Sequence, residues 1–214
     1  GINDFLVTDN EHQDFYLVYG FWEPGCLEKW HGFDMQRQWQ ALLPEDLVRS
    51  EPSLLVSNDT LFLSKPSGDQ IWMVDEINGD ARQLILNSDY SLQPIFFQND
   101  ILIIEAIRTR GSARYELWAI NTKTGKQSWQ IIPKAKKSLE DNVSSIVGAD
   151  GIFSVQPDGE ALILLQAFDD NPTISFERID IKSGVIASHT ELILPEATIF
   201  TLDLIGWHGQ TVWL

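Results

Sequence analysis

Short runs of apolar residues recur along the whole chain and are separated by polar turns. In three places such a run ends in Asp or Asn, and Gly follows four residues later. We call the Asp or Asn the anchor and the segment up to the Gly the anchor turn. Repetition at a fixed spacing indicates a repeat architecture with one structural unit per copy. The three copies are 71–75 with Gly79, 117–121 with Gly125, and 176–180 with Gly184.

A second pattern precedes each anchor and consists of two apolar runs joined by a polar turn. It occurs at 54–63, 95–104, 145–155 and 202–214, with a looser copy at 5–19. Asn-Asp and Asp-Gly pairs tolerate the backbone angles of tight hairpins. The β-branched and aromatic residues around them favour strands. Each full unit therefore reads as a hairpin, a third strand that ends at the anchor, and a fourth strand after the anchor turn.

Four-stranded units that repeat at a period of about 40 to 50 residues are typical of a β-propeller. We therefore predict an all-β fold, a β-propeller of four-stranded antiparallel blades in a single domain over 1–214. Four complete units are followed by a C-terminal half unit, which suggests an incomplete ring. A five-bladed ring whose last blade borrows strands from the N-terminus is the alternative. Short helical turns are expected only at 44–49 and 138–143. The predicted units cover about 4–42, 53–87, 93–132, 144–191 and, in part, 198–214.

The segment from Ala119 to Trp129 resembles the repeat of PQQ-like, quinoprotein-type propellers, Ala-x-Asp-x-x-x-Gly-x-x-x-Trp, with Asn121 in place of Asp. In that family the Trp docks onto the neighbouring blade. The other repeats carry Gln83 and Ser188 where this Trp would be. The first unit has Asp34 and Trp39, with a shorter turn and no Gly. The segment 71–84 also resembles TolB-type propeller repeats.

The resemblance implies that some relatives bind a quinone and oxidise alcohols or sugars. Those enzymes are similar in using adjacent cysteines near the cofactor and a carboxylate and Asn set around calcium. This chain has one cysteine and no recognisable set of that kind. We therefore predict no cofactor. Other relatives act as scaffolds or binding platforms, and the architecture hosts many unrelated activities.

The charge balance narrows the choice of partner. Lys and Arg total 15 against 31 Asp and Glu, for a net charge of −16. Such a surface repels phosphate backbones and favours cationic partners, so we expect no nucleic acid. The basic cluster Lys134, Lys136 and Lys137 is expected to be a solvated loop. No apolar run is long enough to span a bilayer, and no signal peptide is visible, which leaves the compartment of this soluble chain undetermined.

Residues with reactive side chains give no catalytic, cofactor-binding or metal-site assignment. Cys26 is expected to be a small buried apolar residue, as a lone Cys in a strand-rich region usually is. It is not expected to be a nucleophile, because His31, five residues on, lies on the opposite face of an extended strand. Carboxylate pairs for glycoside hydrolysis follow no spacing rule that selects them here. Asp169-Asp170-Asn171 lacks the spacing of a calcium loop. Trp22, next to a turn, is a candidate for ligand or protein contact. The histidines lack zinc-ligand spacing; they are His12, His31, His189 and His208.

These features favour a non-enzymatic protein-binding or scaffold propeller. Its partner would be another protein or a missing segment of the same protein, bound across one end of the ring or through an open strand edge. The alternatives are a propeller enzyme, glycoside hydrolase-like or quinoprotein-like, and a propeller that binds a sugar or another small ligand.

Overall fold

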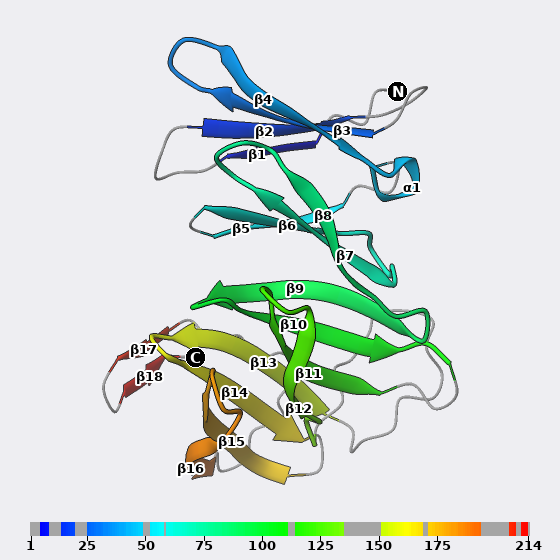
Figure 1. Ribbon diagram of the computed structural model, residues 1–214. Coiled ribbons are helices and arrows are strands. Elements are labelled where there is room, and N and C mark those ends of the chain that lie inside the picture. The colour runs from blue at the N-terminus through cyan, green and yellow to red at the C-terminus, as the bar shows by residue number, and fades with distance from the viewer. Residues whose placement is uncertain are drawn as a thin grey trace. The chain divides into compact units, whose positions relative to one another are not determined.

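The computed structural model describes residues 5–8, 14–19, 25–48, 52–57, 59–110, 114–134, 151–168, 171–193, 206–208 and 211–213 (Figure 1). The described residues form an all-β structure with one short helix, α1 (Glu45–Val48). The chain divides into two compact units, 1–97 and 98–214. No described helix is long and apolar enough to cross a membrane.

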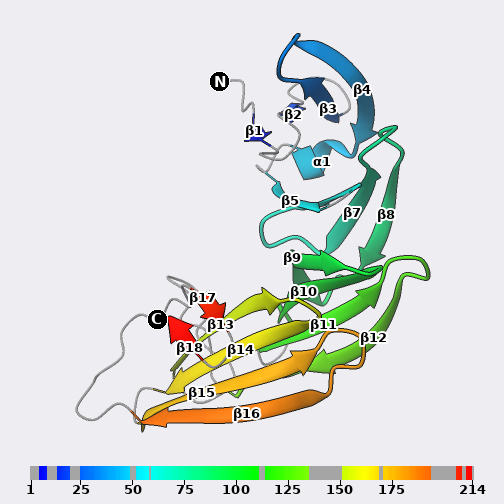
Figure 2. The same ribbon diagram turned by 90° about the vertical axis from the view of Figure 1, so that its left-hand side faces the viewer.

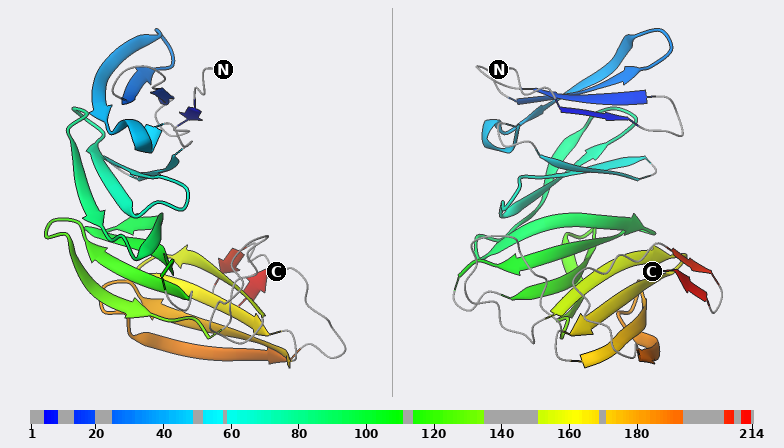
Figure 3. Two further views of the ribbon diagram at one scale, coloured as in Figure 1. Left: turned by 90° about the vertical axis from the view of Figure 1, so that its right-hand side faces the viewer. Right: turned by 180° about the vertical axis from the view of Figure 1, so that it is seen from behind.

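The first unit contains two antiparallel four-stranded sheets, each with its strands in chain order. The first sheet is β1 (Phe5–Thr8), β2 (Asp14–Tyr19), β3 (Gly25–His31) and β4 (Gln36–Leu43). The second sheet is β5 (Ser53–Ser57), β6 (Thr60–Ser64), β7 (Gln70–Asp75) and β8 (Ala81–Leu86). Helix α1 follows β4 (Figure 3), within the predicted helical turn at 44–49.

The core of the first unit lies between these two sheets. Tyr16 and Leu27 of the first sheet and Leu61 and Val74 of the second are fully buried in one apolar cluster. Strand β4 buries every second residue from Trp39 onward. Burial of alternate residues by the neighbouring sheet is the packing expected of adjacent propeller blades.

The third and fourth sheets have the same order of strands. The third is β9 (Tyr90–Gln98), β10 (Ile101–Arg108), β11 (Tyr115–Asn121) and β12 (Lys126–Ile131). The fourth is β13 (Gly151–Asp158), β14 (Ala161–Phe168), β15 (Asn171–Asp180) and β16 (Ile186–Ile193), with β16 at its edge (Figure 2). A two-stranded sheet, β17 (Gly206–His208) and β18 (Thr211–Trp213), follows.

The predicted fold class is confirmed, because four antiparallel four-stranded sheets follow one another along the chain. The anchors Asp75, Asn121 and Asp180 end the third strand of their sheets, as expected. The predicted helical turn at 138–143 lies outside the described residues. The incomplete ring stays a prediction, with the closed five-bladed ring as its alternative.

Candidate functional site

Two tryptophans on outer strands join neighbouring sheets within the units. The indole N–H of Trp39 donates to the main-chain oxygen of Glu76 at 2.8 Å, and that of Trp129 donates to the oxygen of Ile181 at 2.7 Å. In both cases the acceptor is the residue that directly follows the anchor of the next sheet. We call Trp39 and Trp129 the docking tryptophans. The docking of a Trp onto the neighbouring sheet, expected for Trp129, thus also occurs at Trp39 of the first sheet.

Glycine is required in the anchor turn because the docking ring lies against it. Gly79 and Gly184 have φ of +77° and +72°. A Cβ on Gly79 would lie 2.7 Å from Cε3 of Trp39, and one on Gly184 would lie 2.5 Å from Cγ of Trp129. Both the left-handed backbone and the close ring exclude a side chain at these positions.

A β-bulge directs each docking tryptophan. Lys29 pairs with Trp39 while Trp30 pairs with Arg37, which leaves Gln38 as the extra residue. The same shift leaves Ser128 extra, directly before Trp129. In the second sheet the extra residue is Leu84, one position after Gln83. The fourth sheet has the same shift as the first and third, with Ala187 extra directly before Ser188. Bulges commonly turn a side chain toward a new direction, and in these three sheets one precedes the docking position whether or not a Trp occupies it.

The anchor turn of the first sheet corrects the sequence interpretation. That interpretation placed Asp34 in a shorter turn without Gly. In the structure β3 ends at His31, and the N–H of Met35 donates to the oxygen of His31 at 3.0 Å. This bond matches that from Gly79 to Asp75, so the turn has its ordinary length. Met35 takes the glycine position with φ of +54°.

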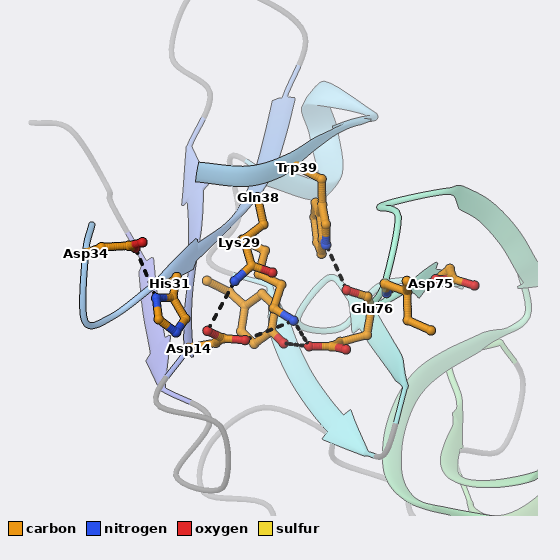
Figure 4. A network of polar contacts seen from close by, with 10 residues as sticks. Asp14, Lys29, His31, Asp34, Gln38, Trp39, Asp75 and Glu76 are labelled. Carbon is orange, nitrogen blue, oxygen red and sulfur yellow. Dashed lines mark hydrogen bonds and ion pairs between the residues drawn. The ribbon is translucent and has the colours of Figure 1, made fainter. Parts of the chain in front are cut away.

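Four polar side chains meet between the first and second sheets (Figure 4). We call Asp14, Tyr16, Lys29 and Glu76 the polar cluster. The hydroxyl of Tyr16 donates to Oε1 of Glu76 at 2.8 Å, and the ammonium of Lys29 donates to the same oxygen. Lys29 also lies 3.0 Å from Oδ2 of Asp14. All four residues are buried.

Hydrogen bonds within the polar cluster favour the charged form of Lys29. Burial of the ammonium alone would lower the pKa of Lys29, but hydrogen bonds to Glu76 and Asp14 outweigh burial and raise it. One buried cation is thereby shared by two buried carboxylates. A buried charge is tolerated only with partners of this kind, so the cluster fixes how the two sheets meet.

Glu28 is a further buried carboxylate and lies within the first sheet. It accepts hydrogen bonds from Tyr19 at 2.7 Å, from the Trp30 indole at 2.9 Å and from Arg37 at 2.6 Å. Burial alone would raise the pKa of Glu28, and these donors outweigh it and lower that pKa. Burial and the neighbouring Glu28 raise the pKa of Tyr19 to about 12. These three donors engage both carboxylate oxygens of Glu28 and stabilise the sheet.

A pocket of about 420 Å³ lies in the second unit, at the hairpin turns of the third and fourth sheets. Its carboxylates are those of Asp100, Glu160 and Asp180, and Lys182 is its cation. Hydrogen bonds from the Ser183 side chain and main chain lower the pKa of Asp180. Oε1 of Gln98, another lining residue, is buried without a hydrogen-bond partner. The pocket is therefore polar and rich in acceptors.

The outer strand of the fourth sheet is uncovered on both faces. All eight residues of β16 are exposed, and they include Ile186, Leu192 and Ile193. By repeat position Ser188, Thr190 and Leu192 correspond to the buried Trp39, Ala41 and Leu43 of β4. We call Ser188, Thr190 and Leu192 the docking face of β16.

Among the residues that the structure describes, those singled out for chemistry do not come together. Cys26 is buried, as expected, and its Sγ accepts a hydrogen bond from Gln40 at 3.1 Å. His31 contacts Asp34 at 3.0 Å, and His189 contacts Glu191 at 3.2 Å.

Several of these positions lie outside the described residues. They are His12, Trp22, Lys136, Lys137, Asp169 and Asp170, and nothing is described of the His208 side chain.

The described residues do not fit the calcium and quinone group of the resembling enzymes. No group of three or more His, Cys, Asp or Glu able to hold a metal occurs among them. The single cysteine of the chain cannot supply an adjacent pair. The polar cluster and the β16 face were not anticipated from the sequence. The sequence repeat had already placed Ser188 at the docking position, but the exposure of β16 and the polar cluster appear only with the strand register.

No protein-family model matches the chain, and no curated protein matches it. Solved propeller structures do. The quinohemoprotein alcohol dehydrogenase of Comamonas testosteroni is 13% identical, with a TM-score of 0.54 over 89% of this chain and 35% of that one. The Pyrococcus horikoshii acylaminoacyl peptidase is 12% identical, with a TM-score of 0.55 over 89% of this chain and 32% of that one. A prolyl endopeptidase structure is 11% identical, with a TM-score of 0.57 over 91% of this chain and 27% of that one.

This chain spans well under half the length of those three proteins. Likeness at such low identity shows the propeller-type fold and nothing about activity.

Proposed function

We propose that the chain is a non-enzymatic protein-binding module of propeller type and that a partner packs on the docking face of β16. The observation that carries the proposal is the exposure of every residue of this strand. An edge strand with exposed aliphatic side chains offers both free backbone groups and apolar area to a second chain. In the first sheet the equivalent strand buries this face under the next sheet.

The chemistry of the docking face indicates the kind of partner. Ser188 stands where Trp39 and Trp129 fill the space between sheets, so a partner sheet must supply the bulky side chain there. Leu192 is 42% exposed and provides the apolar surface beside it. The net charge of −16 favours a partner with basic residues at the rim. The occupant is therefore a β-structured partner with an aromatic residue at the contact and a basic surround.

The use of the buried charges supports binding over catalysis. A catalytic acid or base needs a side chain that can exchange a proton with a substrate. Lys29 and Glu28 have their polar atoms engaged by neighbouring side chains. Glu116 is similarly engaged by Arg114 and by the Trp118 indole. These charges stabilise the sheets.

Site-specific photocrosslinking tests the proposal. A photoreactive amino acid in place of Ser188 should capture a partner in the producing cells, and one in place of Gln127, exposed on β12, should not. With the captured protein purified, Leu192→Arg should weaken binding about tenfold or more. Gln127→Arg adds the same charge on another outer strand and should leave the affinity unchanged. Equal binding of Leu192→Arg and the native chain, or turnover of a sugar or alcohol by the purified chain, would refute the proposal.

The turn pocket favours a second candidate function, the binding of a small polar ligand. Its acceptor groups fit the hydroxyls of a sugar, and its volume lies within the range of small-molecule sites. A thermal-shift panel of neutral monosaccharides tests this. Glu160→Gln should remove any stabilisation, and Asp59→Asn, which changes the corresponding hairpin turn of the second sheet, should preserve it. Absence of a shift for the whole panel counts against this candidate.

A further inference from the structure

The interface between the first and second sheets and that between β10–β12 and the fourth sheet share one docking geometry. A tryptophan follows a bulge, donates to the residue after the next anchor and lies against a left-handed glycine. The register makes each position of one interface correspond to one position of the other. Lys29 pairs with Trp39 as Ala119 pairs with Trp129.

The two interfaces differ in the residues that surround this shared geometry. Where the first sheet has Asp14, Tyr16 and Lys29, the third has Ile101, Ile103 and Ala119. The residue that accepts the indole hydrogen bond also differs: it is Glu76 in the second sheet and Ile181 in the fourth. One interface is therefore polar and internally neutralised in part, while its counterpart is apolar.

We propose that the polar cluster is a matching device that makes the first sheet pack only on the second. If the first sheet packed on a sheet that has Ile directly after its anchor, Lys29 would be buried without Glu76. The hydroxyl of Tyr16 would also lose Glu76 as its acceptor. Packing of the third sheet on the second would bury Glu76 against isoleucine. Each exchange buries an incompletely paired charge, which is strongly unfavourable. The shared tryptophan and glycine contacts do not distinguish the correct sheet from the wrong one.

The polar cluster is not needed for stability as such. A well-packed apolar group of similar volume often equals or exceeds a buried ion pair, whereas removal of one partner is strongly destabilising. The apolar interface of the second unit shows that the same backbone arrangement accommodates the apolar set. The polar cluster then differs from the apolar residues of the other interface in that it selects which sheet packs against which.

Two variants of the full chain test the proposal. Glu76→Ile alone removes the acceptor and leaves Lys29 and Asp14 buried. The fourfold variant Asp14→Ile, Tyr16→Ile, Lys29→Ala and Glu76→Ile reproduces the residues of the other interface. Lys126→Ile, which removes an exposed charge from β12, serves as the control. Each protein is unfolded in urea, refolded, and examined by hydrogen exchange of peptides from 14–31 and 70–86, and by light scattering after size exclusion.

Glu76→Ile should destabilise the first unit and raise its unfolding equilibrium constant by about 100-fold or more. The fourfold variant should regain native stability but refold to more than one population, seen as two exchange envelopes over 14–31 or as additional oligomers. The native chain and Lys126→Ile should give one population. A fourfold variant that refolds to a single native-like population overturns the matching role. Unchanged stability of Glu76→Ile overturns the coupling of the two sheets through the cluster.

Discussion

Replacement of Gly184 by alanine tests whether the docking tryptophan requires glycine in the anchor turn. Gly184 has φ of +72°, and an added Cβ would lie 2.5 Å from Cγ and 2.9 Å from Cβ of Trp129. The Cβ of Trp129 is fixed to its own backbone, so rotation of the ring cannot relieve the overlap. The tryptophan must withdraw and lose its hydrogen bond to Ile181.

The chain supplies a matched control in the same sheet. Gly159 has φ of +61°, and a Cβ there would meet nothing within 4 Å. Alanine at Gly159 therefore incurs only the left-handed backbone cost of about 1 to 2 kcal/mol. At Gly184 the same cost is joined by about 1 to 3 kcal/mol of overpacking and about 1 kcal/mol for the indole hydrogen bond. We expect losses of about 3 to 6 kcal/mol for Gly184→Ala and about 1 to 2 for Gly159→Ala.

Urea unfolding, followed by hydrogen exchange of peptides from 161–193, measures both variants in the same segment. The local readout is necessary because the chain has two compact units, and a single global transition need not describe both. Equal losses for the two variants would refute the packing argument, since only the backbone contribution is common to them. Gly159→Ala also controls for any general effect of alanine in a left-handed turn.

Three further outcomes follow from the same geometry. Trp129→Phe keeps a ring but removes the donor to the Ile181 oxygen, and should cost about 1 to 2 kcal/mol in urea unfolding. Met35→Gly should stabilise the first unit by about 1 kcal/mol, because it relieves a left-handed φ at an exposed side chain. Because folding raises the pKa of Tyr19, its neutral hydroxyl stabilises the folded state. This contribution to stability is complete below pH 10.0 and is lost as the pH rises from 10.0 toward about 12. Tyrosinate absorbance and alkaline unfolding should show this loss in the native chain, and Tyr19→Phe should lack it.

The anchor turns could be predicted from the sequence because their interactions are local. Oδ1 of Asp75 accepts the N–H groups of Ile77 and Asn78, and Asn121 does the same for Thr124. Such contacts join residues two or three positions apart, so the residue types at those positions in the sequence are enough to predict them. The propeller-type fold followed from their repetition.

The turn between β3 and β4 of the first sheet could not be predicted from the sequence pattern. It is built on His31 and Met35, neither of which belongs to the Asp-to-Gly pattern. The main-chain bond between them keeps the turn length, and docking of Trp39 holds the neighbouring sheet in place. Tertiary packing thus allows an unfavourable residue in a left-handed position, at a cost that the sequence alone does not display.

The polar cluster lies beyond sequence reasoning for a different reason. Tyr16 and Glu76 are 60 residues apart, and Lys29 and Glu76 are 47 apart. No periodicity connects them, since the lengths of the intervening turns decide which side chains meet. Only the strand register shows that these positions are apolar in the corresponding interface.

Comparison of the repeats separates what holds the sheets together from what is particular to this chain. The tryptophan, the bulge and the left-handed glycine recur in both units and explain the fold. Two features depart from that pattern, the polar cluster and the docking face of β16. The polar cluster is buried between two sheets, so its specificity can act only on which sheets of the chain pack together. The docking face of β16 is exposed, so its small Ser188 can affect only what packs against the chain from outside. Leu192→Arg should therefore weaken partner binding without disturbing the first unit, while Glu76→Ile should disturb that unit without changing the docking face.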